Sequence, residues 1–174
     1  MNLPNILTMI RFALIPIMVY LLALEQYWQG IAIYTLASIT DILDGYIARK
    51  YNLITPLGKI LDPTADKLLQ FSALIMLNIK TGLPIWITVV FFAKEILMAI
   101  GAYVLYKKNV VVQARWYGKL ATSIFFVAII LAILSAIFTE LATYSIILIY
   151  IAIAITLFAF VMYFINYMVK KKVS

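Results

Sequence analysis

The sequence predicts an all-α integral membrane protein with six transmembrane helices and a short N-terminal interfacial segment. Apolar residues make up 66% of its 174 residues and charged residues 12%, whereas soluble domains average about 45–50% and about 25%. Apolar stretches near the length that crosses the hydrocarbon region, about 20 residues, recur six times. These observations exclude an ordinary soluble globule, and they exclude a disordered chain, which needs low hydrophobicity.

Short polar or helix-breaking segments separate the six predicted spans. The spans cover residues 6–24, 31–48, 60–79, 85–106, 117–138 and 144–168, and residues 1–5 form the interfacial segment. No segment between them is long enough to divide the chain. We therefore predict a single membrane domain over residues 1–174.

Basic residues predict how the chain is oriented. If both termini are cytoplasmic and the spans alternate, twelve of the fourteen Lys and Arg residues fall on the cytoplasmic side, as the positive-inside rule requires. This distribution predicts a protein of the cell membrane with both termini in the cytoplasm. We expect the lipid bilayer around it, anionic lipid at its basic face, and no nucleic-acid partner.

The composition restricts the available chemistry. The chain has no His and no Cys, which excludes the usual zinc sites, Cys nucleophiles, His acid–base catalysis and disulfides. Seven carboxylates remain, and four of them fall within one stretch of 26 residues on two successive predicted spans. These four are Asp41, Asp44, Asp62 and Asp66.

Their spacing brings the four carboxylates toward one place. Asp41 and Asp44 are three residues apart, and Asp62 and Asp66 are four apart, so each pair shares a helix face. A carboxylate at the centre of a span costs about 2.5–3.5 kcal/mol, and four of them repel one another. Divalent ions that prefer oxygen ligands, Mg²⁺ or Mn²⁺, remove both penalties. Two such ions form the arrangement used for displacement at phosphorus.

Two other interpretations of the acids stay open. The carboxylates could simply pair with Arg49, Lys59 and Lys67 at a hydrated helix end. The chain could also be a small cation transporter with the acids as its ion path. Acids of an ion path are more naturally spread through the membrane depth, whereas these cluster at one cytoplasmic end.

Neighbouring residues fit a substrate that carries phosphate. Gly45 lies inside a predicted helix, where Gly costs up to about 1 kcal/mol, and its missing side chain lets a ligand approach the backbone. Ala48 keeps the same groove shallow, and Arg49 is placed to pair with a phosphate. Gly58 opens the next helix. Close helix packing is the alternative explanation for both glycines.

These residues together resemble the signature of the CDP-alcohol phosphotransferase family. The signature runs Asp41-Ile-Leu-Asp44-Gly45-Tyr-Ile-Ala48-Arg49 and, after eight residues, Gly58-Lys-Ile-Leu-Asp62-Pro-Thr-Ala-Asp66. The beginning of the chain resembles that of the bacterial phosphatidylglycerophosphate synthases of this family through Asn2-Leu3-Pro4-Asn5, Thr8 and Arg11. Six spans over this length are also typical of the family.

The resemblance implies an activity and assigns roles to residues. The enzyme would transfer the phosphatidyl group of CDP-diacylglycerol to glycerol 3-phosphate and release CMP, as a homodimer. The four aspartates would hold two divalent ions, Mg²⁺ or Mn²⁺, and Asp66 would also be the base that deprotonates the acceptor hydroxyl. The residues expected to bind the cytidine diphosphate part are Asn5, Thr8, Asp41, Gly45, Ala48, Arg49 and Gly58.

Candidate acceptor residues lie at the start of the fifth predicted span. Arg115, Lys119 and Thr122 can share one helix face. They resemble the Gly-Lys…Thr segment of family members that use a glycerol phosphate, which implies that they bind the acceptor. Cytoplasmic anchoring by basic residues and a helix start are the alternative explanation.

The fourth span departs from the pattern of phosphatidylglycerophosphate synthases. Those proteins commonly carry Arg-Glu followed by a second Arg, whereas this chain has Lys94-Glu95 and then Ala102. Adjacent residues on a helix are not expected to face each other. The run from Gly118 to Thr122 also resembles the single-domain cardiolipin synthases of the family. Phosphatidylglycerol is therefore the alternative acceptor.

Overall fold

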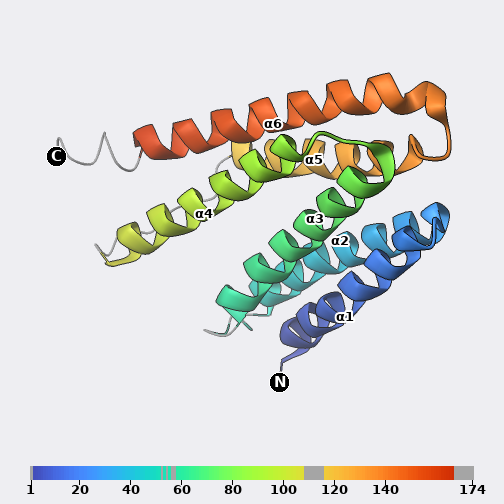
Figure 1. The fold of residues 1–174 in the computed structure, drawn as a ribbon. Helices are drawn as coiled ribbons and strands as arrows, with labels where there is room; N and C mark the ends of the chain where they lie inside the picture. The colour runs from blue at the N-terminus through green and yellow to red at the C-terminus, as the bar shows by residue number, and fades with distance from the viewer. Residues whose placement is uncertain (1, 52, 54, 56–57, 108–115, 167–174) are drawn as a thin grey trace. The chain divides into compact units, whose positions relative to one another are not determined.

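A computed structural model of the chain describes residues 2–51, 53, 55, 58–107 and 116–166. Within these residues the secondary structure is entirely helical (Figure 1), which confirms the predicted all-α class. The helices are α1 (Leu3–Ala23), α2 (Tyr27–Lys50), α3 (Gly58–Thr81), α4 (Ile85–Lys107), α5 (Trp116–Leu134), the short 3₁₀ helix η1 (Thr139–Leu141) and α6 (Ala142–Phe164).

Four segments of the described chain are long and apolar enough to cross a membrane. They are Leu3–Ala23, Tyr27–Ala48, Ile85–Leu105 and Thr139–Phe164. The apolar part of α5, Gly118–Leu134, is shorter, and α3 carries the charged residues Asp62, Asp66 and Lys67 near its start. Spanning by α3 and α5 stays a prediction.

The chain divides into two compact units, Met1–Gly82 and Leu83–Ser174. In the first unit α1 packs against both α2 and α3, and in the second α6 packs against α4 and α5. The single domain over residues 1–174 stays a prediction.

The buried face of α1 has a polar part and an apolar part. Its buried residues recur every three or four positions, which is one face of a helix. They are Pro4, Asn5, Thr8, Arg11, Leu14, Ile15, Met18 and Leu22. The polar part, called here the polar stripe of α1, consists of Asn5, Thr8 and Arg11. It belongs to the same unit as the four aspartates, and the apolar residues after Arg11 contribute to the core of that unit.

Helix α1 begins earlier than the predicted span. Leu3, Pro4 and Asn5 are its first turn, whereas the sequence predicted a separate interfacial segment there. Proline fits this position because the N–H groups of a first helical turn have no partner within the helix. The early start brings Asn5 into the polar stripe.

Helix α2 also begins earlier than predicted, at Tyr27, because Gly30 does not interrupt it. A Cβ at Gly30 would lie 2.4 Å from Cδ2 of the buried Leu22 on α1. The glycine therefore allows close packing of α1 on α2. The chain reverses between the helices through Glu25, which has a positive φ of 61°.

Helix α5 ends at Leu134, four residues before the predicted end of its span. The N–H of Ala136 donates to the carbonyl of Ile133 and that of Ile137 to Leu134, so these two backbone bonds reach back three residues instead of four. The Ser135 hydroxyl donates to the carbonyl of Ala132 at 2.8 Å. Such side-chain bonds compete with the helix, and the turn leads into η1.

Candidate active site

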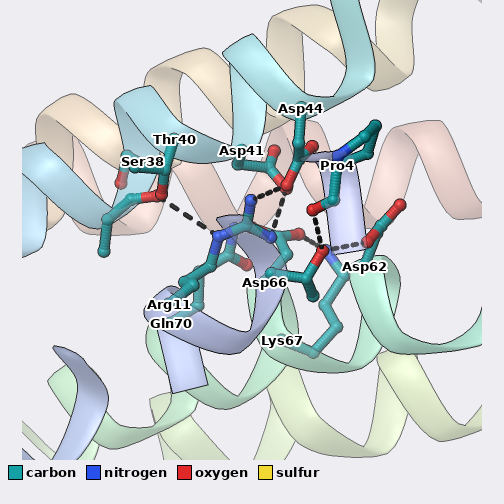
Figure 2. A network of polar contacts seen from close by, with 12 residues as sticks. Pro4, Arg11, Ser38, Thr40, Asp41, Asp44, Asp62, Asp66, Lys67 and Gln70 are labelled. Atoms are coloured by element: carbon teal, nitrogen blue, oxygen red, sulfur yellow. Dashed lines mark hydrogen bonds and ion pairs between the residues drawn. The ribbon is translucent and has the colours of Figure 1, made fainter. Parts of the chain in front are cut away.

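Helices α2 and α3 bring the four aspartates to one end of the first unit (Figure 2). Asp41 and Asp44 lie in the second half of α2, and Asp62 and Asp66 lie in the first turns of α3. The two pairs are near enough for the charges of Asp62 and Asp66 to act on Asp41. The spacing argument from the sequence therefore agrees with where these side chains lie.

A buried arginine from α1 joins the α2 pair. Arg11 is 0% exposed. Its Nη1 lies 2.7 Å from Oδ1 of Asp41, and its Nη2 donates to Oδ2 of Asp44 at 2.5 Å. Its Nε donates to the carbonyl of Ala37 at 3.3 Å. The sequence placed Arg11 among the cytoplasmic basic residues and in the N-terminal pattern that resembles the family, but it assigned the residue no partner, so its contact with the aspartates is a new observation.

Thr8 connects α1 to the α3 pair. It is fully buried, and its hydroxyl oxygen lies 2.5 Å from Oδ1 of Asp62 and 3.1 Å from the carbonyl oxygen of Pro4. One hydroxyl proton serves one of these acceptors at a time. Thr8 was predicted to bind the nucleotide, and in this structure it contacts a predicted metal ligand.

Asn5 and Gly58 lie together at the start of α3. The Thr55 hydroxyl donates to Oδ1 of Asn5 at 3.1 Å, and the N–H of Gly58 donates to the Thr55 oxygen at 2.9 Å. A Cβ on Gly58 would lie 3.0 Å from Oδ1 of Asn5 and 3.1 Å from Oγ1 of Thr55. Gly58 thus makes room for the protein's own polar side chains, which is the packing explanation left open by the sequence.

Two neighbours hold the carboxylate of Asp66. Nε2 of Gln70 donates to Oδ1 at 2.9 Å, and Nζ of Lys67 lies 3.1 Å from Oδ2. Lys67 is one of the cations that the ion-pair interpretation named. Gln70 is buried and was not singled out from the sequence, although its position one helical turn after Asp66 was a usable signal.

The donor chemistry of this site fits a hard divalent ion. Asp41, Asp44, Asp62 and Asp66 offer only carboxylate oxygens, the ligands that Mg²⁺ and Mn²⁺ prefer. Within the residues that the structure describes, no three acidic side chains are arranged around one position that an ion could occupy. The salt bridges of Arg11 account for the positions of two of them.

The other predicted nucleotide-binding residues follow Asp44 on α2. Gly45 and Ala48 are half-buried there. The backbone of Arg49 belongs to α2, but its side chain lies outside the described residues. Their nucleotide contacts stay predictions.

The predicted acceptor residues belong to the second unit. Arg115 lies outside the described residues, and Lys119 and Thr122 are exposed on α5. The Thr122 hydroxyl donates to the carbonyl of Lys119 at 2.9 Å. Bonds of this kind are common for Thr within helices, so this contact is a local one within α5.

Lys94 and Glu95 form an ion pair on α4. The expectation that these adjacent residues do not face each other was wrong. Both side chains are long enough to meet beside the helix, and the low exposure of Lys94 favours a paired charge. The ammonium also lies 5.1 Å from the ring centroid of Phe91.

Comparison with known proteins places these residues in a family context. A model of the CDP-alcohol phosphatidyltransferase family matches residues 1–165. A CDP-diacylglycerol–glycerol-3-phosphate 3-phosphatidyltransferase of Bacillus subtilis (strain 168) is 38% identical over 136 residues, 70% of each chain. A probable phosphatidylglycerophosphate synthase of Mycobacterium tuberculosis (strain ATCC 25618 / H37Rv) is 40% identical over 142 residues, 76% of this chain and 66% of the relative. A cardiolipin synthase (CMP-forming) of Streptomyces coelicolor is 33% identical over 130 residues, 70% and 60% respectively.

Proposed function

Since the chain belongs to the CDP-alcohol phosphatidyltransferase family, we propose that it transfers the phosphatidyl group of CDP-diacylglycerol to glycerol 3-phosphate. The family match over residues 1–165 carries this proposal. The names of the Bacillus and Mycobacterium relatives support the acceptor. The gathering of four aspartates by α2 and α3 supports chemistry at a phosphate.

The reaction replaces one phosphorus–oxygen bond by another. The acceptor hydroxyl oxygen forms a bond to the phosphorus that carries the diacylglycerol. The bond from that phosphorus to the bridging oxygen breaks, and CMP leaves with the electron pair. Asp66 takes the hydroxyl proton, and Gln70 and Lys67 hold its two carboxylate oxygens in place for this transfer.

Mg²⁺ or Mn²⁺ held by Asp41, Asp44, Asp62 and Asp66 would supply positive charge to the diphosphate and to the leaving CMP. Thr8 orients Asp62 through its hydroxyl. Asn5 and Gly58 position the start of α3. These residues, with Gly45, Ala48 and Arg49 on α2, are proposed to receive the cytidine diphosphate part.

The protein is an integral membrane enzyme with its active site at one membrane face. Asp62 and Lys80 lie near opposite ends of α3, 18 residues or about 27 Å apart along the helix. At the end of α3 away from the aspartates, Nζ of Lys80 forms an ion pair with Glu25 at 3.0 Å. We place the aspartates and both termini on the cytoplasmic side, where the positive-inside rule puts most of the basic residues, and we propose a homodimer.

A second acceptor has its own support. The chain carries Lys94 where phosphatidylglycerophosphate synthases commonly have Arg, and the Streptomyces relative is named a cardiolipin synthase. With phosphatidylglycerol as acceptor, the same bond changes would give cardiolipin and CMP.

An assay of CMP release separates these functions. Purified protein receives CDP-diacylglycerol, Mn²⁺ and one acceptor at a time: glycerol 3-phosphate, phosphatidylglycerol, serine or inositol phosphate. We expect release with glycerol 3-phosphate. Release with phosphatidylglycerol alone would assign the second function, and no release with any acceptor would contradict the enzymatic proposal.

Lys119 is expected to bind the phosphate of the acceptor. Its replacement by Ala should raise the KM for glycerol 3-phosphate at least about tenfold, because one charge-assisted hydrogen bond is worth about 1.5–3 kcal/mol, and should leave the KM for CDP-diacylglycerol unchanged. Steady-state kinetics measure both constants. Lys107→Ala removes an equal charge from the exposed end of α4 and serves as the matched control. An unchanged acceptor KM in Lys119→Ala would remove this residue from the acceptor site.

A further inference from the structure

Arg11 lies deeper than topology alone requires. It is eight residues, or about 12 Å, along α1 from Leu3, and it is fully buried. Basic residues that set only orientation lie at helix ends or extend to the interface. Arg11 instead directs its guanidinium onto Asp41 and Asp44 (Figure 2).

This contact occupies the carboxylates that a metal ion would need. Arg11 takes one oxygen of each aspartate, and the side chain of Asp44 is only 2% exposed while that of Asp41 is 39% exposed. Asp41 is therefore open to an incoming cation, whereas Asp44 is buried together with Arg11.

The contact is also one that a divalent ion can replace. Nη1 of Arg11 is buried and makes no well-directed hydrogen bond, although it lies 2.7 Å from Asp41. Charge therefore contributes more to this contact than hydrogen-bond geometry. A divalent ion carries twice the charge and, in the case of Mg²⁺, approaches oxygen to about 2.0–2.1 Å, so its attraction to the carboxylates is stronger.

We propose that Arg11 competes with the divalent ion for Asp41 and Asp44. Without the ion, Arg11 offsets part of the negative charge of the two aspartates and holds them in the arrangement of this structure. When the ion binds, Arg11 releases at least one carboxylate. The inference rests on the proposed function, which supplies the ion, and it makes Arg11 a positioning residue that sets how readily the site is occupied.

If Arg11 supported metal binding instead of competing with it, its loss would change the metal affinity in the opposite direction. If Arg11 merely oriented the aspartates as metal ligands, its loss would weaken metal binding about 10–100-fold. If Arg11 competes, its loss frees two carboxylates and removes a positive charge close to the ion, so binding becomes tighter.

Titration of the purified full-length protein with Mn²⁺ decides between these roles. The protein is held in lipid nanodiscs without CDP-diacylglycerol, and electron paramagnetic resonance follows free Mn²⁺. Arg11→Met keeps most of the side-chain length and removes the charge, and we expect its Kd for Mn²⁺ to fall at least about tenfold. Lys80→Met, which removes the same charge from the far end of α3 in the same unit, should leave the Kd within about twofold of the parent value.

A second variant tests the proposal if Arg11→Met does not fold. Arg11→Lys keeps the charge but loses the fork that contacts two carboxylates, so its Kd should fall by a smaller factor. Equal or weaker Mn²⁺ binding in the folded variants would overturn the competition while leaving the proposed function in place. Absence of Mn²⁺ binding in the parent protein would overturn the competition together with the metal dependence of the proposed function.

Discussion

Replacing Asp66 by Asn is expected to lower the turnover number at least about a thousandfold while the protein stays folded. Asn has the same shape, and its carbonyl oxygen can still accept the hydrogen bond from Gln70. It cannot take the acceptor proton, and proton transfer by a positioned base contributes about 10²–10⁴-fold. CMP release at saturating substrates measures the loss, and near-normal turnover would contradict the role of Asp66 as the base.

A comparison with Asp41 separates the base from a metal ligand. Asp41→Asn removes a carboxylate that is predicted to hold the ion and to contact the cytidine diphosphate part but not to take the proton, so raising the Mn²⁺ concentration should restore part of its activity. Asp66→Asn should gain nothing from the added Mn²⁺, because its proton acceptor is missing. If both variants recover equally, Asp66 acts as a ligand alone. Gln70→Leu keeps the base and removes only its neighbour, so it should lose about tenfold in turnover.

The helices and the aspartate pairs could be predicted from the sequence because local spacing determines them. Apolar runs near the span length predicted the six α-helices of the described residues, and intervals of three and four residues placed Asp41 with Asp44 and Asp62 with Asp66. Nothing beyond helix geometry and a short connection was needed to bring these two pairs to one end of the first unit.

Features that depend on contacts between distant segments could not be predicted from the sequence. Gly30 was expected within a break between helices, and its actual role depends on Leu22 of α1, which packs where a Cβ would lie. Arg11 was grouped with the residues that set orientation and with the N-terminal pattern that resembles the family, but not with the aspartates, although its spacing from Asn5 and Thr8 was visible as one helix face. Its burial follows from the packing of α1 against both α2 and α3, which the local pattern does not encode.

The polar stripe of α1 links the site's chemistry to the stability of the first unit. Each of its members contacts a different part of the site: Asn5 the start of α3, Thr8 the carboxylate of Asp62, and Arg11 the pair on α2. A membrane protein gains little by burying apolar groups from lipid, so packing and polar contacts between helices carry more of its stability. Substitutions at this site should therefore change folding as well as catalysis.

Replacing Asp44 by Leu should produce the largest loss of stability. Arg11 would stay buried with only the more exposed Asp41 as its charged partner, and removal of one member of a buried ion pair costs about 3–5 kcal/mol. We expect about 3 kcal/mol off the free energy of unfolding, since one partner remains. Unfolding by sodium dodecyl sulfate in mixed micelles, followed by circular dichroism, gives this quantity.

Asp44→Leu should lower the free energy of unfolding far less when Arg11 is replaced as well. In Arg11→Met/Asp44→Leu an apolar pair fills the space of the ion pair, and such exchanges are often neutral or stabilising. The exposed pair of Lys80 and Glu25 is the matched control, and breaking it should cost about 0–1 kcal/mol. An equal cost of Asp44→Leu in both backgrounds would show that Arg11 does not depend on Asp44. Recovery of stability without recovery of CMP release would show that the reaction needs the carboxylate of Asp44 for more than holding the helices together, as expected for a residue that is proposed to hold the metal ion.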